Sequence, residues 1–152
     1  MIKSPLRYPG GKSRAIKQIS QHLPTQFTEF REPLVGGGSV FIYLKQTFPN
    51  LKIWINDFNR ELYLFWHICQ QNLPQLITEI HHIKENQKDG KKLFQELTNI
   101  EDIDKLSDIE RAVRFFVLNR ITFHFLQQAT SLRAGSRAAT PRICGGAPPG
   151  HP

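Results

Sequence analysis

Hydrophobic spacing divides the chain into an N-terminal part with strand and helix patterns and a following helical part. Two short β-rich runs, at 27–31 and 51–57, flank an amphipathic helical pattern that begins at Ser39. A further short helix is predicted at 13–22, after a Pro-Gly-Gly turn. Strand, glycine turn, helix and strand in this order predict an α/β unit.

Apolar positions recur at helical spacing from residue 59 onward, with a break predicted at Pro74. Ser107 and Glu110 have the spacing of a capping box, which predicts a helix running to about Phe123. We therefore expect a helical segment at about 59–123, inserted in a partial α/β domain that spans residues 1–123.

The composition changes after Phe123. Residues 124–152 contain no acidic residue, and prolines and glycines interrupt them with almost no hydrophobic periodicity after Leu132. This composition predicts a disordered C-terminal tail. The alternative is a basic nucleic-acid-binding tail, carried by Arg133, Arg137 and Arg142.

Three consecutive glycines, Gly36, Gly37 and Gly38, connect the first predicted strand to the helix that begins at Ser39. Glycines lack a Cβ atom, so a ligand can approach the main chain closely. Ser39 is expected to cap the helix, whose first amides would face that ligand. The pattern predicts a cradle for a nucleotide-like cofactor. A flexible loop is the alternative interpretation of three glycines.

Asp57 ends the second predicted strand and follows Gly36 at about the 20-residue offset at which a Rossmann-like unit places its ribose-binding carboxylate. The alternative is that Asp57 caps the helix that follows it. The two roles are compatible with each other.

Residues 3–17 carry five basic residues and no acid around the turn Pro9-Gly10-Gly11. Tyr8 and Lys12 lie on either side of this turn. Gly11-Lys12-Ser13 is similar to the end of a phosphate-binding P-loop, but Leu6 stands where that motif requires a glycine, and no buried strand precedes it. We reject the P-loop interpretation.

The 20 Lys and Arg residues exceed the 13 Asp and Glu residues and give a formal charge of +7, which is compatible with a polyanionic partner. No stretch reaches the roughly 20 apolar residues of a membrane span, and the N-terminus lacks a signal peptide's apolar core. We expect a soluble, cytoplasmic protein. Cys69 and Cys144 suggest no disulfide framework, and His81 and His82 lack the partners of a metal site.

Four segments together resemble the Dam-type DNA adenine-N6 methyltransferases. Leu6 to Arg14 is similar to the family's opening motif, and Asn56 to Asn59 to the acidic motif after its second strand. Residues 111–123 are similar to the helix that leads into its target-recognition region. The closest likeness is Glu32 to Phe41, which differs from Glu-Pro-Phe-x-Gly-Gly-Gly-Ser-Val-Phe in having Leu34 in place of the usual phenylalanine.

The resemblance implies an incomplete Rossmann-like fold that binds S-adenosylmethionine and acts on double-stranded DNA. Carried over by position, it implies that Tyr8 and Lys12 line the cofactor pocket. It implies further that Gly36, Gly37 and Gly38 hold the methionine portion and that Asp57 binds the ribose hydroxyls. Arg7 matches a basic DNA contact, and Phe123 an aromatic residue that approaches the duplex.

One family motif is absent. Methyl transfer in this family uses an Asp/Asn-Pro-Pro-Tyr/Phe motif that holds the flipped adenine, and the Pro148-Pro149 pair found here is followed by Gly150. We therefore expect a truncated and inactive fragment whose likeness to the family ends near residue 124. The alternatives are one half of a split methyltransferase and a basic DNA-binding module without a methyl donor. The sequence specifies neither a recognition site nor membership of a restriction-modification system.

Overall fold

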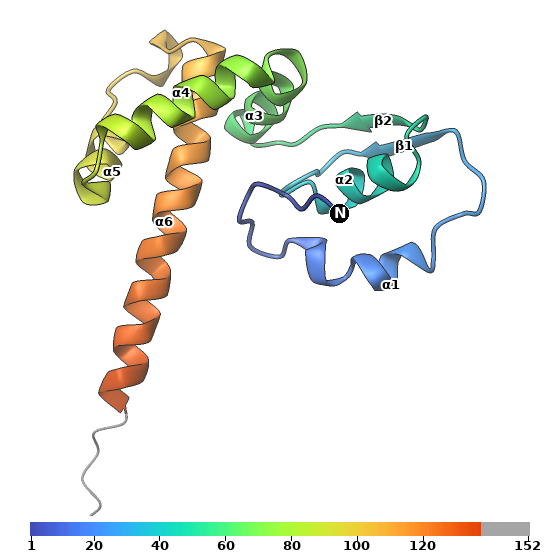
Figure 1. The fold of residues 1–152 in the computed structure, drawn as a ribbon, viewed down its shortest axis with the longest axis horizontal. Coiled ribbons are helices and arrows are strands. Elements are labelled where there is room, and N and C mark those ends of the chain that lie inside the picture. Colours follow the sequence, from blue (N-terminus) through green and yellow to red (C-terminus); the bar gives the residue numbers. More distant parts are fainter. Residues whose placement is uncertain (138–152) are drawn as a thin grey trace, which may run out of the picture.

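The computed structural model describes the backbone of residues 1–137 and the side chains of residues 1–122. Figure 1 shows two groups of elements, one containing both strands and the other containing the helices that follow them in the chain. In chain order the elements are η1 (Lys12–Arg14), α1 (Ile16–Ser20), β1 (Glu29–Glu32), α2 (Ser39–Thr47), β2 (Lys52–Ile55), α3 (Arg60–Gln71), α4 (Leu73–Asn86), α5 (Gly90–Thr98), η2 (Ile103–Lys105) and α6 (Asp108–Arg137), where η marks a 3-10 helix.

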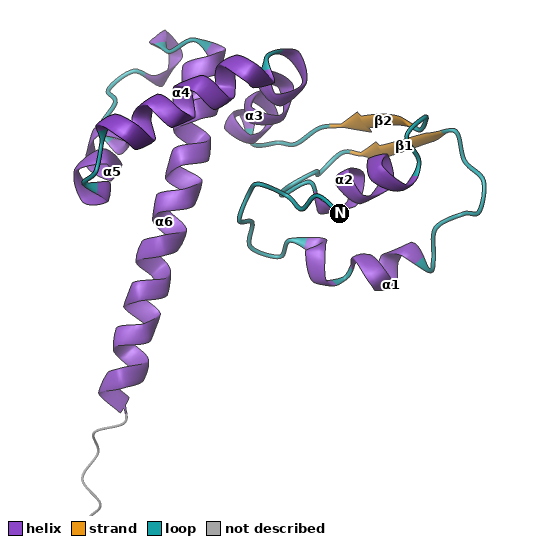
Figure 2. Ribbon diagram, in the orientation of Figure 1, coloured by secondary structure: helices purple, strands orange, loops and turns teal. Residues whose placement is uncertain are grey.

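The two strands form a small parallel sheet, drawn side by side in Figure 2. Glu29 lies opposite Lys52, and Glu32 lies opposite Ile55. Parallel strands require a crossover connection, and α2 supplies it. The carboxyl ends of both strands therefore meet at one edge, where the Asn56 amide donates to the Glu32 carbonyl at 3.0 Å. This edge positions the glycine turn and Asp57 together.

Two groups of buried side chains hold the elements together. A small one joins α2 to the start of β2 and consists of Val40, Leu44 and Leu51. The larger one lies mainly between α3, α4 and α6, and it also takes in Leu6 from the N-terminal segment. Its buried members are Leu6, Val35, Leu62, Phe65, Trp66, Leu76, Ala112, Val113 and Val117.

A buried ion pair fastens α6 to α3. The Arg111 side chain is 6% exposed, and its Nε donates to Oε1 of Glu61 at 3.0 Å. Its Nη1 also donates to Asp104, in η2, at 2.8 Å. These hydrogen bonds, that to Glu61 foremost, raise the pKa of Arg111. Removal of either partner of a buried pair leaves an uncompensated charge, so the pair fixes the helices in one arrangement.

The expected combination of strands, helices and a helical segment is confirmed, and so are two helix boundaries. Pro74 is the second residue of α4, where a missing amide donor costs little. Ser107 and Glu110 form the predicted capping box, with the Ser107 amide donating to Oε2 of Glu110 at 2.8 Å. The predicted helix at 13–22 is divided into η1 and α1.

The predicted end of the last helix is wrong. The α6 helix continues past Phe123 to Arg137, so a disordered tail does not begin at residue 124. Residues 124–137 include the good helix formers leucine, glutamine, alanine and arginine, and they include no proline. Three of the four glycines and all prolines that suggested a tail come after Arg137, and residues 138–152 lie outside the described part.

Candidate functional site

The glycine turn adopts a conformation that ordinary residues avoid. Gly36 has φ +49° and Gly38 has φ +73°, both in the left-handed region that glycine enters without strain. All three glycines are buried, and the Gly38 amide donates to the carbonyl of Val35 at 2.9 Å. The backbone thus turns sharply from β1 into α2.

Aromatic side chains of α2 and α3 pack against this turn. A Cβ atom on Gly38 would lie 2.5 Å from Cε1 of Phe41 and 2.7 Å from Cζ2 of Trp66. The Trp66 indole also donates to the carbonyl of Gly36 at 3.1 Å. These contacts argue against the interpretation of the three glycines as a flexible loop. The spacing of residues gave no indication of Trp66, because it lies in α3 and reaches the turn only through packing.

The sequence led us to expect that Ser39 caps α2, and this expectation is wrong. The cap position is taken by Gly38, and no side chain makes a capping hydrogen bond there. The sharp turn shifts Ser39 into the first helical position, where its side chain lines the cavity described below. The first turn of α2 therefore keeps amide donors that no capping side chain satisfies.

The N-terminal segment folds over the glycine turn. The Gly11 amide donates to the carbonyl of Tyr8 at 2.9 Å, and Gly10 has φ +71°, as a tight turn of this kind requires. The Tyr8 ring lies against the glycines, since a Cβ on Gly36 would be 3.0 Å from its Cε1 atom and one on Gly37 would be 2.9 Å from its Cβ. Tyr8 thereby closes one side of the site.

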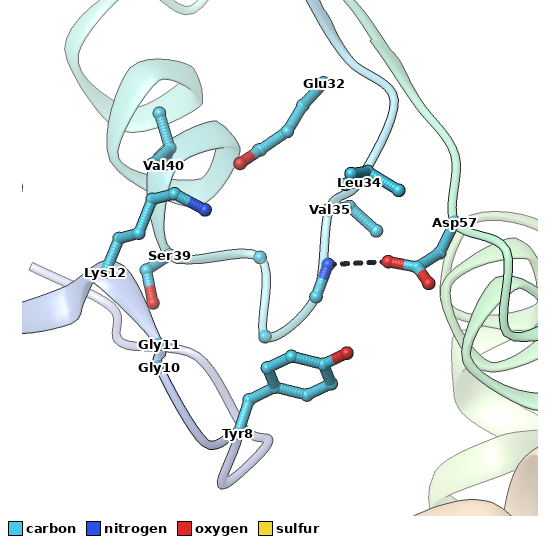
Figure 3. Close-up of a pocket in the computed structure, with 13 residues that line it drawn as sticks. Tyr8, Gly10, Gly11, Lys12, Glu32, Leu34, Val35, Ser39, Val40 and Asp57 are labelled. Carbon is cyan, nitrogen blue, oxygen red and sulfur yellow. Dashed lines mark hydrogen bonds between the residues drawn. The ribbon is translucent and has the colours of Figure 1, made fainter.

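These segments enclose a cavity of about 210 Å³ (Figure 3). Every residue predicted to bind the cofactor lines it: Tyr8, Lys12, Gly36, Gly37, Gly38 and Asp57. The structure thus brings together positions that lie up to 49 residues apart in the sequence, counted from Tyr8 to Asp57. The other lining residues are Gly10, Gly11, Glu32, Leu34, Val35, Ser39 and Val40.

Glu32, at the end of β1, is the main feature that our sequence interpretation left without a role. It is only 9% exposed, and its Oε2 atom has no hydrogen-bond partner within the described part of the chain. Burial raises the pKa of this carboxyl, while the charge of Lys12 and the Phe41 amide act in the opposite direction. Figure 3 shows the Lys12 side chain extending toward Glu32 across the cavity. An acid at the end of a strand, four positions before the first glycine of the turn, is the sequence signal that identifies it.

Asp57 faces the turn from the end of β2. Its Oδ2 accepts a hydrogen bond from the Gly36 amide at 3.0 Å, and its Oδ1 accepts one from the Asn59 amide at 3.1 Å. The helix-cap interpretation of Asp57 is wrong, because Asn59 caps α3 by accepting from the amides of Glu61 and Leu62. Asp57 lies two residues before this cap, at the edge of the cavity.

The two residues matched to DNA contacts lie elsewhere. Arg7 is half-buried and does not line the cavity; its backbone is bound by the side chain of Asn119 in α6. Phe123 lies within α6, but its side chain is outside the described part. Through residue 137, no helix is long and apolar enough to cross a membrane, and the described residues contain no group of three or more His, Cys, Asp or Glu that could hold a metal ion.

Comparison with known proteins identifies the class to which this fold and site belong. Residues 8–134 match the family described as D12 class N6 adenine-specific DNA methyltransferase, and the chain belongs to this family. The resemblance to adenine-N6 methyltransferases is therefore confirmed. The match extends to residue 134, so our expectation that the likeness ends near residue 124 is wrong.

Two relatives bear the name of type II methyltransferases. The chain is 32% identical over 126 residues to the type II methyltransferase M1.LlaDCHI of Lactococcus lactis subsp. cremoris, an alignment covering 82% of this chain and 43% of that protein. It is 26% identical over 137 residues to the type II methyltransferase M.MjaIII of Methanocaldococcus jannaschii, covering 82% of this chain and 47% of that protein. The chain thus spans less than half the length of these relatives.

Proposed function

We propose that this chain is the cofactor-binding part of a cytoplasmic DNA adenine-N6 methyltransferase, built as an incomplete Rossmann-like unit. The observation that carries the proposal is the buried carboxyl of Glu32 at the cavity wall, with Oε2 lacking a partner among the described residues. A buried carboxylate is costly unless it is paired. S-adenosylmethionine carries an ammonium group that would supply the missing donor.

The other lining groups suit the rest of this cofactor. The first amides of α2 favour its carboxylate, because a helix N-terminus attracts negative charge. The face of the Tyr8 ring suits a sulfonium, which is a cation. Each Asp57 oxygen accepts one protein amide and keeps a lone pair for a ribose hydroxyl. When bound, S-adenosylmethionine supplies an electrophilic methyl group on its sulfonium.

The size of the cavity limits what this chain holds by itself. At about 210 Å³ it is smaller than the roughly 300–1,000 Å³ of sites that enclose drug-sized ligands. It is therefore too small to enclose the whole of S-adenosylmethionine. The relatives are more than twice the matched length, which is consistent with further protein completing the pocket. We expect weak cofactor binding.

We further propose that this chain alone does not methylate DNA. The sequence contains no Asp-Pro-Pro-Tyr or equivalent to hold a flipped adenine. Glu32 and Asp57 are engaged in the cofactor cavity, so neither substitutes for that motif. A truncated, inactive fragment fits these observations. In the alternative of a split enzyme, a second chain supplies the acceptor motif; in that of a basic DNA-binding module, no methyl donor binds.

Calorimetric titration with S-adenosylmethionine separates the DNA-binding module, which binds no methyl donor, from the other two possibilities. We expect binding by the unmodified chain, and affinity reduced about 10- to 100-fold in Glu32→Gln, the equivalent of losing one charged hydrogen bond. Glu85→Gln, at an exposed position on α4, is the matched control and should bind as the unmodified chain does. An absence of binding by the unmodified chain would overturn the cofactor proposal and leave the DNA-binding module.

A further inference from the structure

We propose that Asn119, in α6, is a positioning residue, which holds the N-terminal segment against the glycine turn. Its Oδ1 accepts a hydrogen bond from the Arg7 amide at 3.0 Å, and its Nδ2 donates to the Arg7 carbonyl at 2.8 Å. One side chain thus satisfies both backbone groups of a residue 112 positions away. The consequence for the cofactor site rests on the function proposed above.

The geometry of three consecutive residues explains how this contact reaches the cavity. Leu6 is 7% exposed and belongs to the same buried group as Val117 of α6. The next residue, Arg7, is bound by Asn119, and the one after it, Tyr8, packs on Gly36 and Gly37. The position of the Tyr8 ring is therefore set by α6. Figure 1 shows the N-terminal segment curving toward this helix before it turns back to α1.

The two hydrogen bonds fix the orientation of the Arg7 backbone relative to Asn119 as well as its distance. An asparagine amide presents a donor and an acceptor side by side, as a strand backbone does, so it pairs with Arg7 in one orientation. Buried backbone groups that lose such a partner must find water or move. Loss of the pairing is thus expected to release Tyr8 from the glycines while α6 keeps its own packing through Ala112, Val113 and Val117.

Asn119→Ala tests this through a signal that needs no ligand. Aromatic rings shift the NMR resonances of nearby amides, so Gly36 and Gly37 report the position of Tyr8. In the full chain we expect Asn119→Ala to shift these two amide resonances in the same direction as Tyr8→Leu does, with resonances of α4 unchanged. Asn119→Asp keeps the acceptor for the Arg7 amide but places a second oxygen against the Arg7 carbonyl, so it should shift these resonances in the same direction. Asn86→Ala, on the exposed end of α4, is the control.

The same variants then test the link to the cofactor site. Affinity for S-adenosylmethionine should fall roughly tenfold in Asn119→Ala, about 1.4 kcal/mol, and should fall in Asn119→Asp as well. Unchanged Gly36 and Gly37 resonances, resonance changes throughout the protein, or unaltered affinity in Asn119→Ala would each overturn the proposal. If the unmodified chain binds no cofactor while the glycine resonances shift as expected, the positioning role holds and the proposed function fails.

Discussion

The carboxylate of Asp57 accepts a hydrogen bond from the amide of Gly36 at 3.0 Å, joining the end of β2 to the first residue of the glycine turn. The second Asp57 oxygen accepts from the amide of Asn59, just before α3. One side chain therefore orients the turn that follows β1 and the helix that follows β2. The residue proposed to bind ribose is also part of the scaffold of the cavity.

Asp57→Ala should weaken S-adenosylmethionine binding by about 10- to 100-fold, because it removes a charged acceptor worth about 1.5–3 kcal/mol. Asp57→Asn keeps the shape of the side chain and one acceptor oxygen, so its affinity should lie between that of the unmodified chain and that of Asp57→Ala. Titration calorimetry of the three proteins measures the order. Equal affinity in all three would show that Asp57 serves the scaffold alone.

Glu32→Gln should make the ligand-free protein more stable at neutral pH. Burial raises the pKa of Glu32, so the folded state binds this proton more tightly than the unfolded state does. The free energy of unfolding therefore decreases as the pH rises from the ordinary glutamate pKa through the raised value. Glutamine cannot ionise and removes that decrease.

Urea unfolding across a pH series measures the effect, with Glu85→Gln as the control at an exposed glutamate. The difference in stability between Glu32→Gln and the unmodified chain should grow with pH and then level off. A difference that is constant with pH would mean that Glu32 ionises no less easily in the folded protein than in the unfolded chain.

Gly38→Ala should destabilise the fold by about 2–4 kcal/mol, because the added methyl group meets Phe41 and Trp66 in a left-handed backbone position. Gly90 provides a matched control: nothing lies within 4 Å of a Cβ built there, and it is the first residue of α5. Thermal unfolding of Gly38→Ala and of the control Gly90→Ala gives the comparison. Similar melting temperatures for the two variants would contradict the packing of Phe41 and Trp66 against Gly38.

The local parts of this site could be predicted from the sequence, and the parts made by packing could not. Glycines between a strand and a helix, and an acid at the end of the next strand, are set by neighbours along the chain. Trp66 reaches the turn from α3, and Asn119 reaches Arg7 from α6, so no spacing rule indicates either contact. The end of α6 is not evident from composition, because the prolines that favour a tail all lie beyond Arg137.

The described N-terminal segment should bind double-stranded DNA without sequence preference. Lys3, Arg14 and Lys17 are exposed and accompany the half-buried Arg7, with no acid between residues 3 and 17. Contact with about four phosphates would give a slope of log affinity against log salt near −3.6. Lys17→Ala should reduce that slope by about one, and Lys88→Ala, an exposed lysine on the α4–α5 connection, should leave it unchanged. A strong preference for one short sequence in gel-shift assays would contradict this prediction.

The central claim is that this chain holds the methyl donor without completing the reaction. Correct positioning of reactants supplies roughly 7–11 kcal/mol of barrier reduction in reactions of this kind, and the sequence contains no Asp-Pro-Pro-Tyr or equivalent motif to hold the adenine. The direct measurement incubates the purified chain with tritiated S-adenosylmethionine and unmethylated DNA, free of host methyltransferase, and follows the label. We predict that the protein binds the labelled cofactor reversibly at equilibrium and that no label appears in adenine above a control without protein. Label in adenine would contradict the account and imply an acceptor site elsewhere in the chain.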